Sequence, residues 1–392
     1  MEIWPNLELE MGLDYRKKLA RTGEDQIMRN GFKVMDFDMH IREPRDLWEK
    51  YIEPEWRDQG PKIISEPTRS GAMVLVEGKI LRGYPPTRRS PVGSSRMDEG
   101  EAEVIARGFD PISQLNAMDR EGLDVAVLYP SIGLGIMMRP EMNPKLAAAI
   151  ARAYNNWLYD FCQADSNRLK AAGMIPLHDI TEGVKEARRA VTELGFVGVF
   201  ARCEPINGLP WHSKYYDLLW AELEDLGVPI GFHTAASLGE VPQAGDRFGD
   251  DQMLRHMTSH PMENMLAMVD IILGRVLERH PRLKVAFLEC DSGWVPSWLS
   301  RMDAEAGRHG GFKMGPSEYF KRQCWVGTEA EKELPMVVHY IGDENVVFST
   351  DYPHGDSDYP HATEEFFEIE GLSDKSRKKI LWDNCARLYG LP

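Results

Sequence analysis

Short apolar runs alternate with longer amphipathic segments along most of this 392-residue chain, and this alternation constrains the fold more than any other feature. Near-continuous apolar strands separated by helices are typical of a parallel sheet covered on both faces. The pattern predicts eight strands, at residues 32–39, 123–129, 169–177, 196–203, 228–234, 284–290, 324–328 and 345–350. Eight strand–helix units favour an α/β fold of the closed (β/α)8 TIM-barrel type over an open sheet.

Two segments fall outside this alternation. Residues 1–30 are polar and mixed in charge, and we interpret them as an N-terminal arm that precedes a barrel spanning residues 31–392. Residues from about 42 to 115 are irregular and rich in Pro and Gly, which predicts a long insertion after strand 1 that contains small helices or a hairpin, for example at residues 72–81. A Gly-rich phosphate motif does not follow the first strand, which weighs against a dinucleotide-binding fold.

Composition narrows the class of protein further. The formal net charge of −16 disfavours nucleic acid as a partner, because an acidic surface repels phosphates. The five Cys are widely spaced without a C-x-x-C pair, so a disulfide framework is not expected. The sequence shows neither a signal-peptide pattern nor an apolar run near the roughly 20 residues that span a bilayer. These features predict a soluble, cytoplasmic protein.

Imidazole and carboxylate side chains stand at the ends of four predicted strands. In a barrel, the carboxyl ends of all strands meet on one face, where the active site forms. Asp38 and His40 are two residues apart, so both point to the same side of their strand and are suited to share one ion. The other strand ends contribute His233, Glu289, Asp351 and His354. This donor set suits Zn, Mn or Fe, and an open coordination position would make the metal catalytic.

Each of these residues has a structural alternative. Asp38, His40 and Asp351 could cap strand ends or turns, and His233 could be a hydrogen-bonded core histidine. Glu289 is a candidate for a second metal, for acid–base work, or for pairing with an Arg. His260 precedes Pro261 near an expected helix end and is a further candidate for the site, whereas His256 is less favoured. Glu43 would either approach the same ion or cap the turn before Pro44.

Several stretches, in this order and spacing, resemble one family. They are Asp38 to His40 with residues 43–48, then 118–124, 231–233, 274–285, 293–303, 349–354 and 380–389. Together they resemble the amidohydrolase-related metal-dependent hydrolases, in the branch that includes aminocarboxymuconate semialdehyde decarboxylase and γ-resorcylate decarboxylase. The resemblance implies that Asp38, His40, His233 and Asp351 bind the metal.

The chain departs from the decarboxylases at one position. Those enzymes carry a catalytic His at the end of strand six, where this chain has Glu289. The usual proton donor would then be missing, and the added carboxylate is what a second metal requires. A small branch of the superfamily is similar to dinuclear non-haem iron monooxygenases, which keeps that chemistry open.

Three functional hypotheses follow. The first is hydrolysis or non-oxidative decarboxylation of a small carboxylated or ring-bearing molecule, with one divalent ion (Zn, Mn or Fe) and with Asp351, Glu289 or His260 as the catalytic groups. The second is a monooxygenase whose two irons lie among Asp38, His40, His233, Glu289, His260, Asp351 and His354. The third is a non-catalytic partner subunit. A homo-oligomer, or a complex with a related subunit, is expected from the N-terminal arm and from the family.

Overall fold

The computed structural model describes residues 29–64, 73–81, 107–235, 239–355 and 357–392, and its centre is one parallel sheet. The order of the eight strands across this sheet is β1-β5-β6-β7-β8-β9-β10-β11. Strands that are neighbours in the sheet therefore also follow one another along the chain. The strands are β1 (Met35–Ile41), β5 (Val125–Pro130), β6 (Leu169–Met174), β7 (Gly198–Arg202), β8 (Pro229–His233), β9 (Lys284–Phe287), β10 (Cys324–Thr328) and β11 (Val346–Phe348). The predicted barrel is confirmed.

The barrel closes between β1 and the segment that follows β11. The Asp351 amide donates to the Asp38 carbonyl oxygen at 3.2 Å, and the His40 amide donates to the Tyr352 carbonyl oxygen at 2.7 Å. The first and last strands of the barrel are therefore joined at their carboxyl ends, where the predicted site residues lie.

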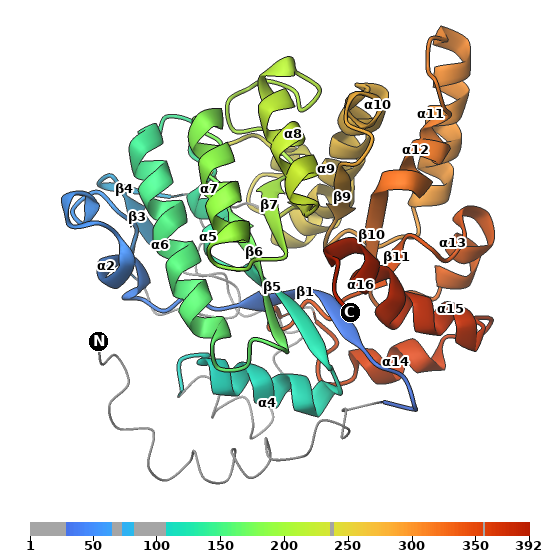
Figure 1. The fold of residues 1–392 in the computed structure, drawn as a ribbon, viewed down its shortest axis with the longest axis horizontal. Helices are drawn as coiled ribbons and strands as arrows, with labels where there is room; N and C mark the ends of the chain where they lie inside the picture. Colours follow the sequence, from blue (N-terminus) through green and yellow to red (C-terminus); the bar gives the residue numbers. More distant parts are fainter. Residues whose placement is uncertain (1–28, 65–72, 82–106, 236–238, 356) are drawn as a thin grey trace.

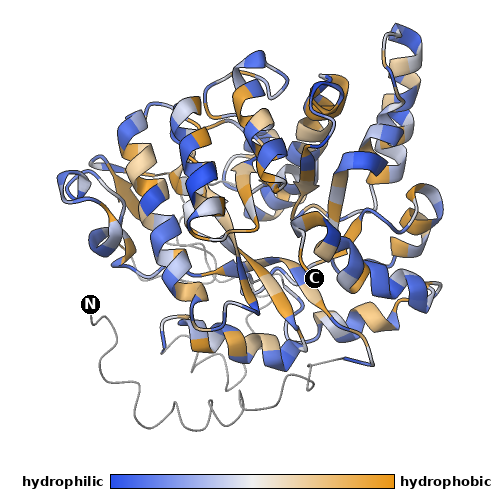
Figure 2. Ribbon diagram, in the orientation of Figure 1, coloured by the Kyte–Doolittle hydropathy of each residue, from blue (hydrophilic) through white to orange (hydrophobic). Residues whose placement is uncertain are grey.

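Helices surround the strands (Figure 1). The longer ones connecting successive strands are α6 (Pro144–Cys162), α7 (Ile180–Thr192), α8 (Asp217–Leu226), α9 (Gln252–Leu273), α11 (Val295–His309), α12 (Pro316–Gln323) and α13 (Leu334–Ile341). Short helices α2 (Leu47–Tyr51), α5 (Gly133–Ile136) and α10 (Val276–Arg279) lie between them, and α14 (Ala362–Glu368), α15 (Asp374–Lys378) and α16 (Asn384–Tyr389) end the chain. Apolar helix faces turn toward the strands and polar faces turn outward (Figure 2).

The region predicted as an insertion contains a small sheet, and a helix whose position was not predicted begins at its end. Strands β2 (Lys62–Ile63), β3 (Val74–Val76) and β4 (Lys79–Ile80) are antiparallel, and the β3–β4 hairpin confirms the one predicted at 72–81. Helix α4 (Pro111–Glu121) starts at Asp110, whose side chain accepts from the Ser113 amide. The predicted arm lies almost entirely in residues 1–28, which, with residues 65–72 and 82–106, are outside the described residues.

The core of the barrel forms a floor beneath the site. Tyr129 on β5 is buried, and its ring centroid lies 5.9 Å from that of His233. Gly231 on β8 makes room for it, because a Cβ there would come within 2.8 Å of Leu288 Cδ1 and 3.0 Å of the Tyr129 hydroxyl. The Tyr129 hydroxyl is hydrogen-bonded to that of Tyr389 at 2.8 Å, which ties the floor to the C-terminal helix α16.

Two expectations about the chain as a whole can be compared with the structure. All five Cys lie within the described residues, and all are buried and free, so the expectation of no disulfide framework is confirmed. Among the described residues, the helices are too short or too polar to cross a bilayer.

Candidate metal centre

Strand β1 places Asp38 and His40 on the same side of the sheet, as their spacing predicts. Both side chains are fully buried, and His40 Nε2 lies 3.4 Å from Asp38 Oδ1. The pairing of β1 with β5 shifts in register between Asp36 and Met39, so the strand is irregular beside the site. Both donors therefore face one point at the mouth of the barrel.

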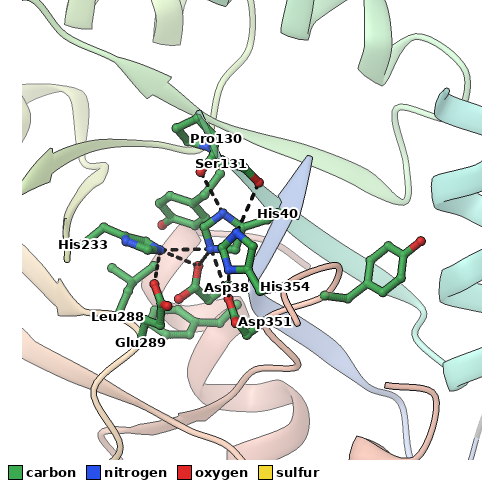
Figure 3. A network of polar contacts seen from close by, with 12 residues as sticks. Asp38, His40, Pro130, Ser131, His233, Leu288, Glu289, Asp351 and His354 are labelled. Atoms are coloured by element: carbon green, nitrogen blue, oxygen red, sulfur yellow. Dashed lines mark hydrogen bonds and ion pairs between the residues drawn. The ribbon is translucent and has the colours of Figure 1, made fainter. Parts of the chain in front are cut away.

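His233 and Asp351 reach the same point from β8 and from the segment after β11 (Figure 3). His233 Nε2 lies 3.0 Å from His40 Nε2 and 3.5 Å from Asp38 Oδ1. Asp351 Oδ1 lies 3.3 Å from His40 Nε2. The structure thus brings together the four side chains that the family resemblance implies as ligands.

The Asp38 carboxylate shows that this arrangement fits a cation. Neither of its buried oxygens has a hydrogen-bond partner among the described residues. Burial opposes ionisation, but His233 and His40 together hold the pKa of Asp38 below its usual range, so the group is an anion. A buried carboxylate without hydrogen bonds is costly unless a positive charge meets it, and a divalent ion supplies that charge.

Backbone carbonyls orient the two central imidazoles. His40 Nδ1 lies 2.7 Å from the Pro130 carbonyl oxygen, and His233 Nδ1 is hydrogen-bonded to the Thr234 carbonyl oxygen. Each Nδ1 carries a proton because a carbonyl only accepts, so Nε2 is the atom directed at the site, and it has a free lone pair when the ring is neutral. This second hydrogen bond is the usual partner of a metal-binding histidine.

Glu289 and His260 form the side of the site nearest to α9. Glu289 Oε2 lies 3.4 Å from His233 Nε2, and Glu289 Oε1 lies 3.0 Å from His260 Nε2. Glu289, Asp291 and Asp351 all have left-handed backbone conformations, with φ of 49°, 55° and 55°. Such conformations are strained for residues other than glycine and concentrate at functional sites.

A hydrogen-bonded chain runs from Ser131 through His354 to Asp351. The Ser131 hydroxyl donates to the Ile41 carbonyl oxygen at 2.8 Å, so it accepts from His354 Nε2, which lies 3.2 Å away. His354 Nδ1 lies 2.8 Å from Asp351 Oδ1. A hydrogen bond there requires a further proton, on the imidazole or on the carboxyl group. His354 and Asp351 therefore share one proton at the edge of the site.

Glu43, which the sequence left open, and His178, which follows β6, both have contacts outside the metal centre. Glu43 is buried and accepts from the amides of Ile132 and Gly133 at 2.9 and 2.6 Å, so it holds the loop after β5 rather than an ion or the turn before Pro44. His178 lies beside Arg139, with Nε2 2.9 Å from its carbonyl oxygen.

Sequence reasoning missed two supporting residues. Ser131 directly follows β5, and the strand-end rule used for His233 would have indicated it. Asp36 lies two residues before Asp38 and accepts hydrogen bonds from the Thr350 hydroxyl and amide. The two-residue alternation that places Asp38 beside His40 would also have placed Asp36 on the same side of the strand.

The comparisons with known proteins identify the family. A family model described as Amidohydrolase matches residues 38–391, so the chain belongs to the amidohydrolase family. It is 27% identical to γ-resorcylate decarboxylase of Rhodococcus jostii over 298 residues, which cover 71% of this chain and 87% of the relative. It is 24% identical to 2-amino-3-carboxymuconate-6-semialdehyde decarboxylase of Dictyostelium discoideum over 305 residues, covering 74% and 79% of the two chains.

Solved structures show the same fold. An amidohydrolase from Mycobacterium avium subsp. paratuberculosis superposes with a TM-score of 0.75 at 23% identity, covering 92% of this chain and all of the other. A dihydroxybenzoic acid decarboxylase from Polaromonas, solved with manganese and 2-nitroresorcinol, gives a TM-score of 0.64 at 18% identity, covering 92% and 97%. The chain is an enzyme of the metal-dependent amidohydrolase class, as its sequence resemblance implied.

Proposed function

We propose that this enzyme removes the carboxyl group of a small aromatic carboxylate without oxidation, using a divalent cation held by Asp38, His40, His233 and Asp351. The observation that carries the proposal is the group of three buried donors Asp38, His40 and His233 at the barrel mouth. Asp351 lies 3.3 Å from His40 Nε2 and is hydrogen-bonded to His354. γ-Resorcylate decarboxylase and the dihydroxybenzoic acid decarboxylase are named for aromatic carboxylates, and the Dictyostelium relative is a decarboxylase of a small non-aromatic carboxylate.

The reaction requires one bond to break and one proton to be delivered. The bond between the ring carbon and the carboxyl group breaks, its electron pair stays on the ring carbon, and carbon dioxide leaves. A bound divalent cation supplies Lewis acidity toward a substrate oxygen. His354 and Asp351 hold the proton that the ring carbon takes up, and Ser131 keeps the imidazole turned toward Asp351.

Glu289 is not suited to donate the proton that the ring carbon takes up. Burial raises the pKa of its carboxyl group, but His260 and then His233 outweigh this and hold the pKa well below its usual range. Glu289 is therefore an anion at neutral pH and has no proton to give. The proton supply is assigned to the His354–Asp351 pair for this reason.

The mixed set of imidazole and carboxylate donors suits manganese, zinc or iron. We propose manganese as the first ion to test, because the Polaromonas decarboxylase was solved with it. The monooxygenase alternative has no counterpart among the relatives named above, whose names describe decarboxylases and amidohydrolases.

The test is turnover of a panel of ortho-hydroxylated benzoates by Mn²⁺-loaded enzyme in deuterated water without oxygen. The proposal predicts one carbon dioxide released per substrate and one deuterium on the ring carbon that carried the carboxyl group. A product that forms only with oxygen, or hydrolysis of an amide or lactone without carbon dioxide release, would contradict it. Asp38→Asn serves as the metal-site control and Asp46→Asn, at a half-exposed carboxylate on the surface, as the matched surface control.

A further inference from the structure

Helix α9 presents a second group of metal-binding side chains beside the four-donor site. His256 and His260 are one helical turn apart, so their side chains lie on the same helix face. Their ring centroids are 3.8 Å apart. His256, His260 and Glu289 each offer a ligand atom, and these atoms lie within 4.8 Å of one another. Two imidazoles and one carboxylate form a common ligand set for a divalent transition metal.

Glu289 belongs to both groups. One of its oxygens faces His260 Nε2 at 3.0 Å, and the other faces His233 Nε2 at 3.4 Å. Glu289 is also within 4.8 Å of ligand atoms of His40, Asp351 and His354. Its Oε2 atom is buried and has no hydrogen-bond partner among the residues that the structure describes. The carboxylate thus lies between two groups of donors with an oxygen directed to each.

The orientation of His260 matches that of the two central imidazoles. His260 Nδ1 lies 3.0 Å from the His256 carbonyl oxygen, as Nδ1 of His40 and of His233 each meets a carbonyl. Nδ1 therefore donates to this carbonyl, and Nε2 is the ring atom that points at Glu289, as Nε2 of His40 and His233 points into the first site.

We infer that His256, His260 and Glu289 form a second divalent-cation site, with Glu289 bridging it to the site of Asp38, His40, His233 and Asp351. A bridging carboxylate places two cations about 3.5–4 Å apart. A cation at this site would replace the Nε2 proton that His260 otherwise shares with Glu289. This inference goes beyond the proposed decarboxylation, which needs one cation, and it rests on that proposal only for the occupancy of the first site.

The experiment measures manganese stoichiometry with Mn²⁺ alone as the probe. Chelator-stripped protein is reloaded with Mn²⁺, freed of unbound ion, and analysed for manganese per chain and for exchange coupling by electron paramagnetic resonance. The wild-type protein is expected to hold two coupled Mn²⁺ per chain. His256→Gln and the double variant H256Q/H260Q are expected to hold one, uncoupled. His309→Gln, at an exposed histidine of α11, is the matched control and is expected to hold two.

The outcomes separate this inference from the proposed function. One Mn²⁺ in the wild-type protein together with decarboxylation overturns the second site and leaves the first. Two Mn²⁺ in the double variant also overturn it, because the second ion then lies elsewhere. A wild-type protein that binds no Mn²⁺ overturns both. If the double variant fails to fold by circular dichroism, the single His256→Gln variant decides, since His256 is half-buried on the helix surface.

Discussion

The backbone amide of Asp351 donates a hydrogen bond of 3.2 Å to the carbonyl oxygen of Asp38. This bond joins the first strand of the barrel to the segment after the last one, and it sets the two carboxylates at 3.4 and 3.3 Å from the same atom, His40 Nε2. The bond that closes the barrel therefore also brings together two of the proposed metal ligands, which come from opposite ends of the chain.

Removal of the Asp38 charge is predicted to abolish metal binding at the first site. In Asp38→Asn the cation loses the one ligand whose two oxygens have no other partner among the described residues. Loss of a supporting hydrogen bond alone lowers metal affinity about 10–100-fold, so loss of a ligand should cost at least about 100-fold. Titration of stripped protein with Mn²⁺ measures this, and an unchanged affinity would show that Asp38 is not a ligand.

Asp36 is predicted to make the stripped enzyme less stable as pH rises. Burial raises the pKa of its carboxyl group to about 7, from 3.8 in the unfolded chain. Between these values the folded state keeps a proton that the unfolded state has released, so the free energy of unfolding falls by up to about 1.4 kcal/mol per pH unit and levels off above the folded pKa.

The variant that tests this is Asp36→Asn, because an amide mimics the protonated carboxyl group. Its oxygen accepts from the amides of Asp38 and Thr350, and its NH2 group faces the Thr350 hydroxyl. Chemical denaturation of stripped protein from pH 5 to 8 should give a flatter stability profile for the variant than for the wild type. Parallel profiles would exclude Asp36 as the titrating group.

Glu43 is predicted to stabilise the fold without contributing to metal binding. Glu43→Ala leaves the buried amides of Ile132 and Gly133 without their acceptor, which should lower the free energy of unfolding by about 1–3 kcal/mol. Denaturant unfolding and manganese content are measured on the same preparation. A variant of normal stability that fails to bind manganese would restore Glu43 as a ligand candidate.

Ser131 is predicted to affect turnover and not metal content. Ser131→Ala removes the acceptor of the His354 Nε2 proton, so the imidazole loses its fixed orientation toward Asp351. Loss of such a support is expected to lower kcat about 10–100-fold with manganese still bound. Threonine restores the hydroxyl, so Ser131→Thr should recover part of the activity. Equal losses in both variants would indicate disturbed packing instead of lost orientation.

The fold and the centre of the site could be predicted from the sequence because both follow from short-range patterns. Apolar runs separated by helices predicted the ends of the strands to within a few residues, and the strand predicted at 324–328 has the same ends as β10. The alternation of side chains along a strand placed Asp38 beside His40. The remaining ligands, His233 and Asp351, then followed from the rule that strand ends converge.

The residues beyond the strand ends were less predictable, for physical reasons. His256 and His260 lie on a helix that packs over the barrel mouth, and the rotation of that helix depends on tertiary packing. Glu43 follows β1 closely, but the irregular chain after the strand turns it toward the loop after β5. Helix α4 was missed because its first residues fall in the Pro- and Gly-rich region interpreted as insertion.

Anomalous diffraction from crystals of the Mn²⁺-loaded enzyme tests the central claim most directly. We predict a manganese peak at the carboxyl end of the barrel, about 2.0–2.3 Å from side-chain atoms of Asp38, His40, His233 and Asp351. A peak elsewhere in the molecule, or crystals of loaded enzyme in which these four side chains surround no ion, would contradict it.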